Sequence, residues 1–251
     1  MTHTEHAKPL ISVCVAAYNG ERYIGEQLSS ILSQLSDNDE LIVSDDGSTD
    51  NTLKIVDSLA DSRILVVKGP HSHSATLNFE CALRHARGEY IFLADQDDVW
   101  RADKVSVCMR ALEKADCVVS DAVMTDCGLN VVSNSLYASM RVSRSRMGSL
   151  FLRNGYTGCC MAFRRRVLDA ALPFPANIPM HDIWIGNVAA FFYSVVFINE
   201  PLVMFRRHEG VVSCNGKGSR FSAWQKFMFR WNVLKDLFTL WIKRHKNNTR
   251  Q

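Results

Sequence analysis

The 251-residue sequence lacks the features that would place it in several large protein classes. No uncharged run reaches the roughly 18 residues that a membrane-spanning helix needs. The N-terminus, MTHTEHAKPLISVCVAAYNG, has neither the basic start nor the long apolar segment of a signal peptide. We therefore expect a cytoplasmic protein. Its 47% hydrophobic and 22% charged residues are typical of an ordinary globular chain.

Motifs for the commonest nucleotide and metal sites are also missing. There is no GxxxxGK[ST] loop for a nucleoside triphosphate, and no GxGxxG follows the first predicted strand. The eight cysteines show no CxxC spacing, and most lie in apolar surroundings, where a thiol packs as a small hydrophobic group. These absences argue against a P-loop enzyme, a dinucleotide-binding domain and a zinc site, and they favour buried, reduced thiols.

Acidic side chains are nearly absent from the C-terminal segment. From Lys217 to the end there are nine Lys or Arg residues and one acid, Asp236, which gives a formal charge of +8. Residues 1–216 contain 20 basic and 25 acidic side chains, for a formal charge of −5. We predict a catalytic domain over 1–216 and a basic tail over 217–251, with different partners.

Strands and helices alternate in the first hundred residues. Apolar, β-branched runs predict strands over 10–17, 40–44, 63–68 and 90–94. Apolar residues at helical spacing predict helices over 21–35, 53–59 and 75–87. This alternation predicts an α/β fold with a mostly parallel central sheet flanked by helices.

The signal weakens after Trp100. The predicted elements there are a helix over 104–114, a strand over 117–120, a mobile loop within 125–148, a helix over 164–172, a helix from His181, and strands over 195–199 and 201–206. No internal repeat is visible.

Polar clusters come directly after three of the predicted strands. These clusters are Tyr18-Asn19, Asp45-Asp46 and the stretch from Asp95 to Asp98. Parallel α/β sheets bind ligands at the carboxyl ends of their strands, so we expect the three clusters to gather at one edge.

The segment EYIFLADQDDVW places three carboxylates, those of Asp95, Asp97 and Asp98, directly after an apolar strand. Such a triplet can be a solvated turn with a helix cap. It can also hold Mg²⁺ or Mn²⁺, which bind through one or two carboxylates together with substrate phosphates. A bound cation would offset the repulsion among the three charges, and the position at a strand end favours this interpretation.

Three motifs in order, AAYNG, VSDDGSTDNT and NFECALRHARGEYIFLADQDDVW, resemble the signatures of glycosyltransferase family 2, the inverting enzymes with a GT-A fold. The resemblance covers roughly residues 9–210. SDDGSTD and DQDDVW are similar to rhamnosyltransferase-like members that assemble bacterial polysaccharides.

The resemblance implies a role for each motif in binding a nucleotide-sugar donor. Ala17, Tyr18 and Asn19 would border the nucleotide, with Tyr18 near the base. Either Asp45 or Asp46 would recognise the base and ribose. The remaining implied donor-site residues are Asn78 and the DxD carboxylates Asp95 and Asp97. Both carboxylates are candidate metal ligands, Asp97 is favoured as the direct one, and Asp98 lies beside them.

The resemblance also suggests a catalytic base and a segment that closes the donor site. Asp182 in MHDIW is the candidate base, although it could be only a helix N-cap. His181 stands where the family usually has an acid, so it could compete with Asp182 or orient it. In FRRH, His208 could bind the metal or diphosphate, and Arg206 or Arg207 could contact phosphate, unless this segment is only a basic strand end facing solvent.

The tail, FSAWQKFMFRWNVLKDLFTLWIKRHK, predicts one amphipathic helix. Its apolar residues at spacings of three and four are Phe221, Trp224, Phe227, Trp231, Leu234, Phe238 and Trp241. Lys226, Arg230 and Lys243 fall off that stripe. The pattern is typical of a helix lying on a membrane surface, but a helix packed on the catalytic body would also fit. Nucleic acid is a poorer partner, because no binding motif accompanies the basic residues.

We therefore expect a metal-dependent enzyme that moves a sugar from a UDP- or dTDP-sugar, such as dTDP-rhamnose or a UDP-hexose. The acceptor would be a saccharide, lipid-linked at the inner face of the cytoplasmic membrane, in O-antigen or capsule synthesis. Two alternatives stay open. ADQDDV fits the DxDx[TV] pattern of haloacid dehalogenase-type phosphatases, although three strand–helix units precede it here. A non-catalytic scaffold that docks on the membrane is the other.

Overall fold

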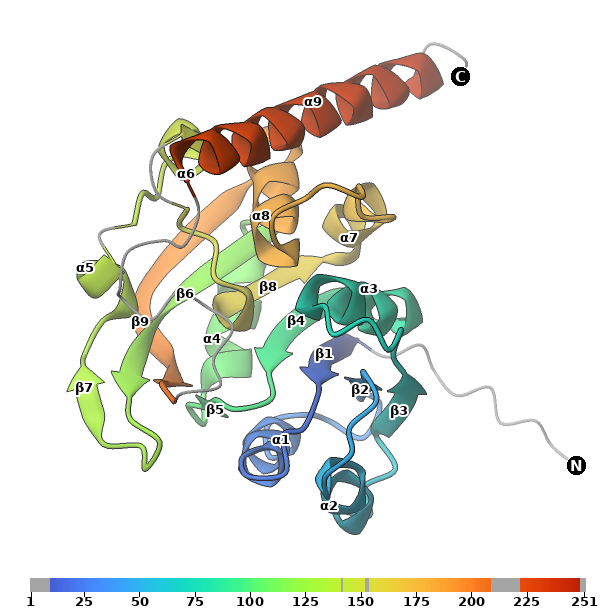
Figure 1. Cartoon of the computed structure of the whole chain (residues 1–251), viewed down its shortest axis with the longest axis vertical. Helices are drawn as coiled ribbons and strands as arrows, with labels where there is room; N and C mark the ends of the chain where they lie inside the picture. Colours follow the sequence, from blue (N-terminus) through green and yellow to red (C-terminus); the bar gives the residue numbers. More distant parts are fainter. Residues whose placement is uncertain (1–9, 141, 152–153, 209–221, 249–251) are drawn as a thin grey trace, which may run out of the picture.

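The computed structural model describes residues 10–140, 142–151, 154–208 and 222–248 (Figure 1). The predicted boundary between 1–216 and 217–251 lies outside these ranges, as do Cys214 and Phe221. The described residues include a nine-stranded sheet with helices packed around it.

The first half of the chain builds the parallel part of the sheet. The central strand β1 pairs in parallel with β2 on one side and β4 on the other, and β3 lies outside β2. These strands are β1 (Ile11–Ala17), β2 (Glu40–Asp45), β3 (Ile64–Lys68) and β4 (Tyr90–Asp95). Each ends or begins within one residue of its predicted bounds, because an uninterrupted apolar run marks it in the sequence.

The second half extends this sheet with one long parallel pairing, β6 with β9, and several short antiparallel pairings. The order across the sheet is β3-β2-β1-β4-β8-β6-β9-β5, and β7 pairs with β6. β8 is antiparallel to both β4 and β6, whereas β9 runs parallel to β6. These strands are β5 (Val99–Trp100), β6 (Cys117–Thr125), β7 (Val131–Ser133), β8 (Met161–Arg164) and β9 (Val195–Arg206).

The helices of the first half connect successive parallel strands, and those of the second half cover the mixed part of the sheet (Figure 1). They are α1 (Ile24–Leu32), α2 (Thr52–Ser58), α3 (Ala75–His85), α4 (Lys104–Leu112), α5 (Leu136–Met140), α6 (Arg146–Phe151), the short 3-10 helix η1 (Gly158–Cys160), α7 (Arg165–Ala171), α8 (His181–Phe192) and α9 (Ala223–Asn248). Within 125–148, where a mobile loop is predicted, β7, α5 and the start of α6 alternate with turns and loops. The Ser- and Asn-rich sequence of this segment hid these short elements.

The three polar clusters do share one edge of the sheet. Ala17, the last residue of β1, is in register with Asp45 at the end of β2, and Ala16 is in register with Asp95 at the end of β4. The parallel register therefore brings the segments after β1, β2 and β4 together, as the sequence predicts.

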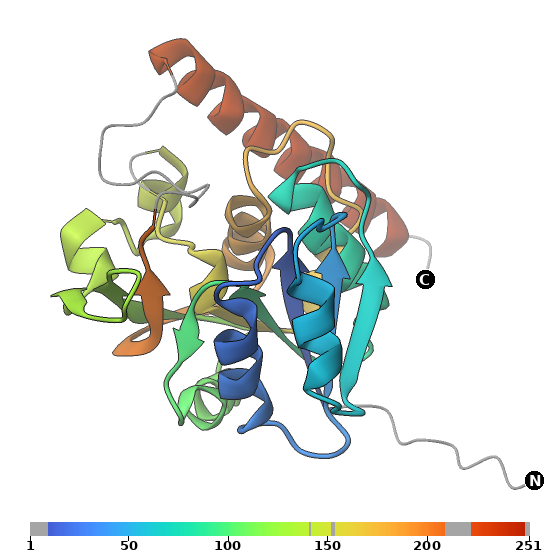
Figure 2. The same ribbon diagram turned by 60° about the horizontal axis from the view of Figure 1, so that its bottom comes forward.

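α9 lies at the far end of the molecule from α1 and α2 (Figures 1 and 2). It packs against α8, and its Val233 and Leu237 are buried. Arg244 Nη1 donates to the Tyr193 hydroxyl at 2.9 Å, and Arg230 Nε donates to the Leu150 carbonyl at 3.2 Å. One side of this helix is thus attached to the catalytic body.

The seven described cysteines are free thiols. Five of them are buried: Cys14, Cys108, Cys117, Cys159 and Cys160. This agrees with the expectation that most thiols are buried; Cys81 is half-buried and Cys127 is exposed.

Candidate functional site

The three aspartates after β4 take different positions. Asp97 lines a cavity of about 630 Å³. Asp98 is completely buried, and its Oδ1 accepts the backbone N–H of Arg206 at 3.0 Å. Asp95 ends β4 and is half-buried. A solvated turn would leave all three carboxylates in water, so that alternative fails for Asp98.

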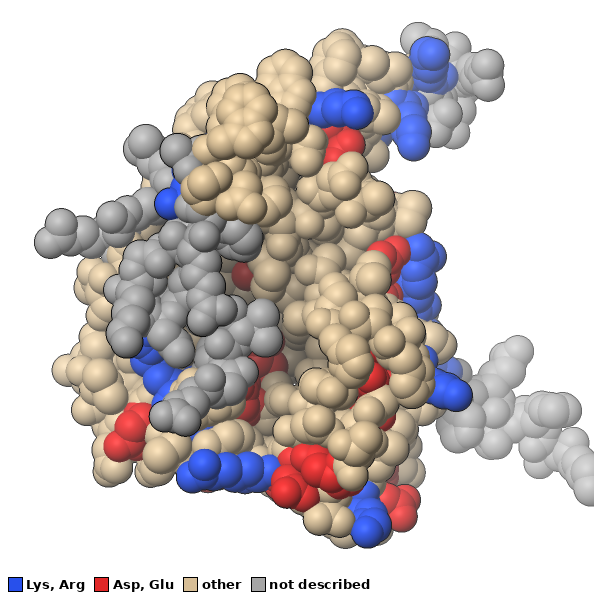
Figure 3. Space-filling model, in the orientation of Figure 1, with Lys and Arg blue, Asp and Glu red and all other residues tan. Residues whose placement is uncertain are grey.

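Asp97 and His208 lie side by side in the wall of the cavity. The distance between His208 Nε2 and Asp97 Oδ2 is 2.8 Å, although the two residues are 111 positions apart. Arg22 and Arg207 line the same cavity. A carboxylate oxygen beside an imidazole nitrogen can hold a divalent cation, and the two guanidinium groups can bind phosphate oxygens. Figure 3 shows acidic side chains within the hollow of this face.

Arg206 does not have the position expected of a phosphate ligand. Its side chain is 4% exposed, and all three of its guanidinium nitrogens donate to the protein. The acceptors are the Asp97 carbonyl at 2.8 Å, the Cys127 carbonyl at 2.7 Å and Glu26 Oε2 at 2.6 Å. We therefore revise its role: Arg206 fixes the backbone of the DQDD segment, and its neighbour Arg207 is the arginine that reaches the cavity.

Tyr18 and Asn19 follow β1, and both contribute to the loops around the cavity. The Tyr18 side chain is 39% exposed, and its ring meets that of His73 edge to face at 4.8 Å between centroids. Asn19 Oδ1 accepts the Thr49 N–H at 2.8 Å, and its own N–H donates to Ser48 Oγ at 2.9 Å. Asn19 thus ties the first loop to the second, while the Tyr18 ring is available to stack on a base.

Asp45 and Asp46 differ in what their carboxylates already bind. Asp45 accepts the backbone N–H groups of Gly47 and Ser48 and the Ser48 hydroxyl, so it organises its own turn. Asp46 Oδ1 accepts the backbone N–H of Ser72 at 3.0 Å, which fixes the loop after β3. Asp46 therefore accepts fewer hydrogen bonds from the protein than Asp45 does, and it is the better candidate of the two for contacting a base or ribose.

Asn78 and Ala17 form the floor between these loops. Asn78 Nδ2 donates to the Ala17 carbonyl at 3.1 Å, and both residues are buried. A side chain at Gly69 would come within 2.7 Å of Asn78 Oδ1 and of the Asp45 carbonyl, so only glycine fits there. Asn78 therefore ties α3 to the end of β1.

Asp182 begins α8, and the η1 turn holds its carboxylate in place. The Gly158 N–H donates to Asp182 Oδ2 at 3.2 Å, and the Ile183 N–H donates to Oδ1 at 2.7 Å. Burial raises the pKa of Asp182 to about 6. A carboxyl group with this pKa is ionised near neutral pH and basic enough to accept a proton.

His181 is buried and stacks on the Phe79 ring at 3.9 Å between centroids. Burial lowers its pKa to about 3, so the ring is neutral at physiological pH. Neither ring nitrogen has a hydrogen-bond partner within the described part of the chain. The geometry therefore gives no orienting bond from His181 to Asp182, and it favours Asp182 as the base.

Asp95 interacts electrostatically both with Asp97 in the cavity wall and with Asp182. Burial, followed by the charges of Asp97 and Asp182, raises the pKa of Asp95 to about 7. Burial and the charges of Asp95 and Asp97 also raise the pKa of Asp98. Four carboxyl groups from two distant segments therefore lie close enough for their charges to interact, and protonation or a bound cation would relieve their repulsion.

Sequence reasoning missed several residues of this site. Gln96 bridges to the Tyr18 backbone, accepting its N–H at 2.9 Å and donating to its carbonyl at 3.0 Å. Arg22 and Cys127 line the cavity, and Cys159 lies between the carboxylates of Asp95 and Asp98. Gln96 could have been found from its place inside the DQDD motif; the other three have no sequence signal.

One protein-family model, Glycosyl transferase family 2, matches residues 12–172. Two Escherichia coli relatives are both named UDP-Glc:alpha-D-GlcNAc-diphosphoundecaprenol beta-1,3-glucosyltransferase. WfaP is 41% identical over 97 residues, which is 39% of either chain. WfgD is 25% identical over 232 residues, covering 90% of this chain and 86% of that protein.

Solved structures show the same fold. The S. aureus TarS fragment 1–349 in complex with UDP-GlcNAc superimposes with a TM-score of 0.70 at 20% identity, covering 92% of this chain and 66% of the other. Glucosyl-3-phosphoglycerate synthase from Mycobacterium tuberculosis, in complex with Mn²⁺, UDP and glucosyl-3-phosphoglycerate, gives a TM-score of 0.55 at 21% identity, covering 80% of this chain and 73% of the other. The predicted GT-A fold is confirmed.

The burial of Asp182 leads to a testable prediction about stability. Its folded pKa, about 6, lies above the ordinary value of 3.8, so ionisation is disfavoured in the folded state. The resulting destabilisation grows between about pH 4 and pH 6 and is fully present above that window. Asp182→Asn should therefore raise the Tm relative to wild type at about pH 8 but not at about pH 4, measured with a chelator present. An equal Tm difference at both pH values would contradict it.

Proposed function

The chain belongs to glycosyl transferase family 2, and we propose that it transfers a sugar, with inversion, from a nucleotide-sugar donor to a saccharide acceptor. The observation that carries this proposal is the convergence of two unlike groups at one sheet edge. One is the cavity wall with Asp97, His208 and two arginines; the other is the basic carboxylate of Asp182.

The donor diphosphate would lie in the cavity. Arg22 and Arg207 would bind its oxygens through charge-assisted hydrogen bonds. Asp97 and His208 would hold a divalent cation, which as a Lewis acid supplies charge stabilisation for the departing diphosphate. The imidazole ligand favours Mn²⁺ over Mg²⁺, because Mg²⁺ prefers oxygen ligands in an octahedral shell. Tyr18 would stack on the base, and Asp46 would accept its hydrogen bonds.

Asp182 would take the proton from the acceptor hydroxyl as that oxygen attacks the anomeric carbon. The N–H groups of Gly158 and Ile183 fix its two oxygens and help to keep it ionised despite its burial. Transfer should therefore need Asp182 in its basic form, and the rate should fall as the pH drops below about 6.

The donor and acceptor classes are proposed from the relatives. WfaP and WfgD are named for transfer from UDP-Glc to a GlcNAc joined by diphosphate to undecaprenol. These names favour a UDP-hexose, with dTDP-rhamnose as the other candidate donor. They also favour a lipid-linked saccharide acceptor in bacterial surface-polysaccharide assembly, reached from the inner face of the cytoplasmic membrane.

An aromatic stripe on α9 would bring the enzyme to that membrane. Its members are Trp224, Phe227, Trp231, Phe238 and Trp241, all between 45% and 68% exposed. Spacings of three, four and seven residues place them along one side of the helix. Leu234, predicted as part of the stripe, instead packs partly against the core. None of the described helices is long and apolar enough to cross a bilayer.

The basic residues of α9 divide into two groups, which refines the predicted basic face. Arg230 and Arg244 hydrogen-bond the catalytic body. Lys235, Lys243 and Lys246 are exposed. Each exposed lysine near an anionic surface would contribute about 1 kcal/mol. We propose that the stripe and these lysines dock on anionic lipid, since exposed tryptophans suit the boundary between headgroups and acyl chains.

The donor site can be tested by thermal unfolding with nucleoside diphosphates, each with and without Mn²⁺. UDP or dTDP at about 100 times its Kd should stabilise the fold by about 2.7 kcal/mol, roughly 5–10 °C for a chain of this size. The shift should require Mn²⁺ and vanish in Asp97→Ala, but persist in Asp57→Ala, which removes an exposed acid on α2. No shift with any nucleotide would contradict the site, and phosphate release from simple phosphoesters would favour the phosphatase alternative.

Transfer itself is expected to fall by roughly 10²–10⁴-fold in Asp182→Asn, because the amide cannot accept the proton. Product would be followed with the donor that the thermal panel selects and a GlcNAc-diphospho-lipid acceptor. Asp57→Asn is the control and should keep full activity. Retained transfer in a folded Asp182→Asn would rule out this residue as the base, and a Mn²⁺–nucleotide complex without turnover on any donor would support the scaffold alternative.

Membrane docking predicts co-sedimentation with phosphatidylglycerol vesicles. The triple change Trp224→Ser, Trp231→Ser and Phe238→Ser should weaken binding at least tenfold, about 1.4 kcal/mol, without unfolding the protein, because these side chains are exposed. Val131→Ser with Val132→Ser, which removes exposed apolar groups elsewhere, is the control. Equal vesicle binding by the triple variant would contradict docking through the stripe, and a wild-type dimer lost in that variant would assign the stripe to self-association.

A further inference from the structure

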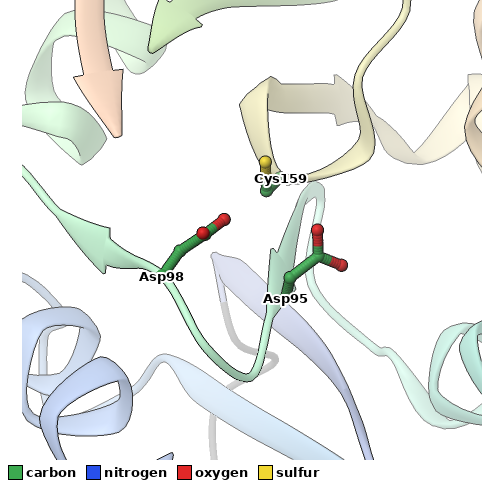
Figure 4. Close-up of side chains that lie close together, drawn as sticks. All are labelled: Asp95, Asp98 and Cys159. Atoms are coloured by element: carbon green, nitrogen blue, oxygen red, sulfur yellow. The ribbon is translucent and has the colours of Figure 1, made fainter. Parts of the chain in front are cut away.

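Three side chains near the proposed donor site form a compact set of ligands with a thiol among them. One atom each from Asp95, Asp98 and Cys159 lies within 4.8 Å of the other two. Figure 4 shows both carboxylates below the turn that carries Cys159. The set joins the end of β4 to the η1 turn, and it is separate from the Asp97–His208 pair in the cavity wall.

One oxygen of this set is a buried acceptor without a hydrogen bond. Asp98 is 0% exposed, and the Arg206 N–H satisfies its Oδ1. Its Oδ2 accepts no hydrogen bond from a nitrogen or oxygen atom in the described part of the chain, and the weakly donating Cys159 thiol is its polar neighbour. An unsatisfied buried carboxylate oxygen is costly, and a cation bound there would satisfy it.

The spacing suits a single small ion. A zinc ion lies about 2.3 Å from a thiolate sulfur and about 2.0–2.2 Å from a carboxylate oxygen, so two of its ligand atoms can be roughly 4 Å apart. Small side-chain rotations would therefore bring all three atoms onto one ion. The sulfur ligand decides which ion the set would bind, because thiolates select softer cations, whereas Mg²⁺ and Mn²⁺ prefer oxygen ligands.

The set also has a cationic neighbour, Lys104. This lysine is fully buried, and its Nζ donates to the Cys159 carbonyl at 2.5 Å while lying 4.0 Å from the centre of the Trp100 ring. Its single charge opposes a second cation. Once a divalent cation has displaced their protons, the two carboxylates and the thiolate carry three negative charges against this one, and the lysine anchors the η1 turn.

We propose that Asp95, Asp98 and Cys159 bind a thiophilic divalent cation, Zn²⁺ or Cd²⁺, and that this cation inhibits the transferase. Binding forms a metal–sulfur bond and two metal–oxygen bonds, and the thiol proton of Cys159 passes to solvent together with any proton held by the Asp95 and Asp98 carboxyl groups. Inhibition follows because Asp95 neighbours both Asp97 and Asp182, so a cation held there redirects a carboxylate of the donor site. This second part rests on the proposed function; the binding part does not.

The binding part is tested by titrating the reduced full chain with Cd²⁺ and following the ultraviolet absorption of cadmium–thiolate bonds. Wild type and Cys160→Ser should share a saturable component that Cys159→Ser lacks. Cys160 is the matched control, since it is an adjacent, equally buried thiol outside the set. Cadmium on the six thiols other than Cys159 and Cys160 is common to the three proteins. Asp98→Asn should weaken the component by about tenfold or more while keeping the thiol.

The inhibition part is tested by measuring transfer at fixed Mn²⁺ with increasing Zn²⁺. Cys159→Ser should need about tenfold more Zn²⁺ for half-inhibition than wild type or Cys160→Ser. The proposal would be overturned if Cys159→Ser and wild type gave the same cadmium absorption, or if both needed the same Zn²⁺ concentration for half-inhibition. If no protein transfers sugar, the proposed function fails, and the cadmium titration still decides whether the site exists.

Discussion

Repulsion among four carboxylates is the constraint on which the rest of this structure depends. Asp95, Asp97 and Asp98 come from one short segment, and Asp182 begins a helix far along the chain. Their mutual charge, added to burial, raises the pKa of Asp95 to about 7. Free in water, these groups would separate. They stay together because β4 is buried between β1 and β8, so the segment that follows it cannot move away.

The groups that offset this negative charge come from segments far from the DQDD motif in the sequence. The Arg206 backbone N–H satisfies one oxygen of Asp98, and the Arg206 guanidinium fixes the Asp97 carbonyl. His208, two residues further on, meets Asp97 directly. The end of β9 therefore positions the DQDD segment from one side, while Lys104 lies buried behind the η1 turn on the other. A cation and a diphosphate would complete the balance.

The η1 turn is the structural link between the two halves of the proposed chemistry. Its Gly158 N–H holds Asp182, its Cys159 thiol approaches Asp95 and Asp98, and Lys104 anchors its backbone. A small displacement of this turn would change the base and the carboxylate cluster together. Such a fixed arrangement of the η1 turn, Asp182 and the carboxylate cluster would suit the proposed transfer, in which the reacting atoms of two substrates must be held close together.

The sequence by itself determined the parallel half of the sheet, its order along the chain and the edge at which the polar clusters meet. Uninterrupted apolar runs mark these strands, and the polar motifs directly after them mark the shared edge, so both features can be read from short stretches of sequence. It also pointed to the apolar stripe of α9, because helical spacing is a local property. Tertiary structure alone decided that Arg206 is buried and Arg207 lines the cavity, since the acceptors around the Arg206 guanidinium come from Glu26, Asp97 and Cys127, far away in the sequence. It alone brought His208 to Asp97, and it placed Cys159 beside Asp95 and Asp98, because contacts between residues more than sixty positions apart depend on strand order and pairing, which no short motif records.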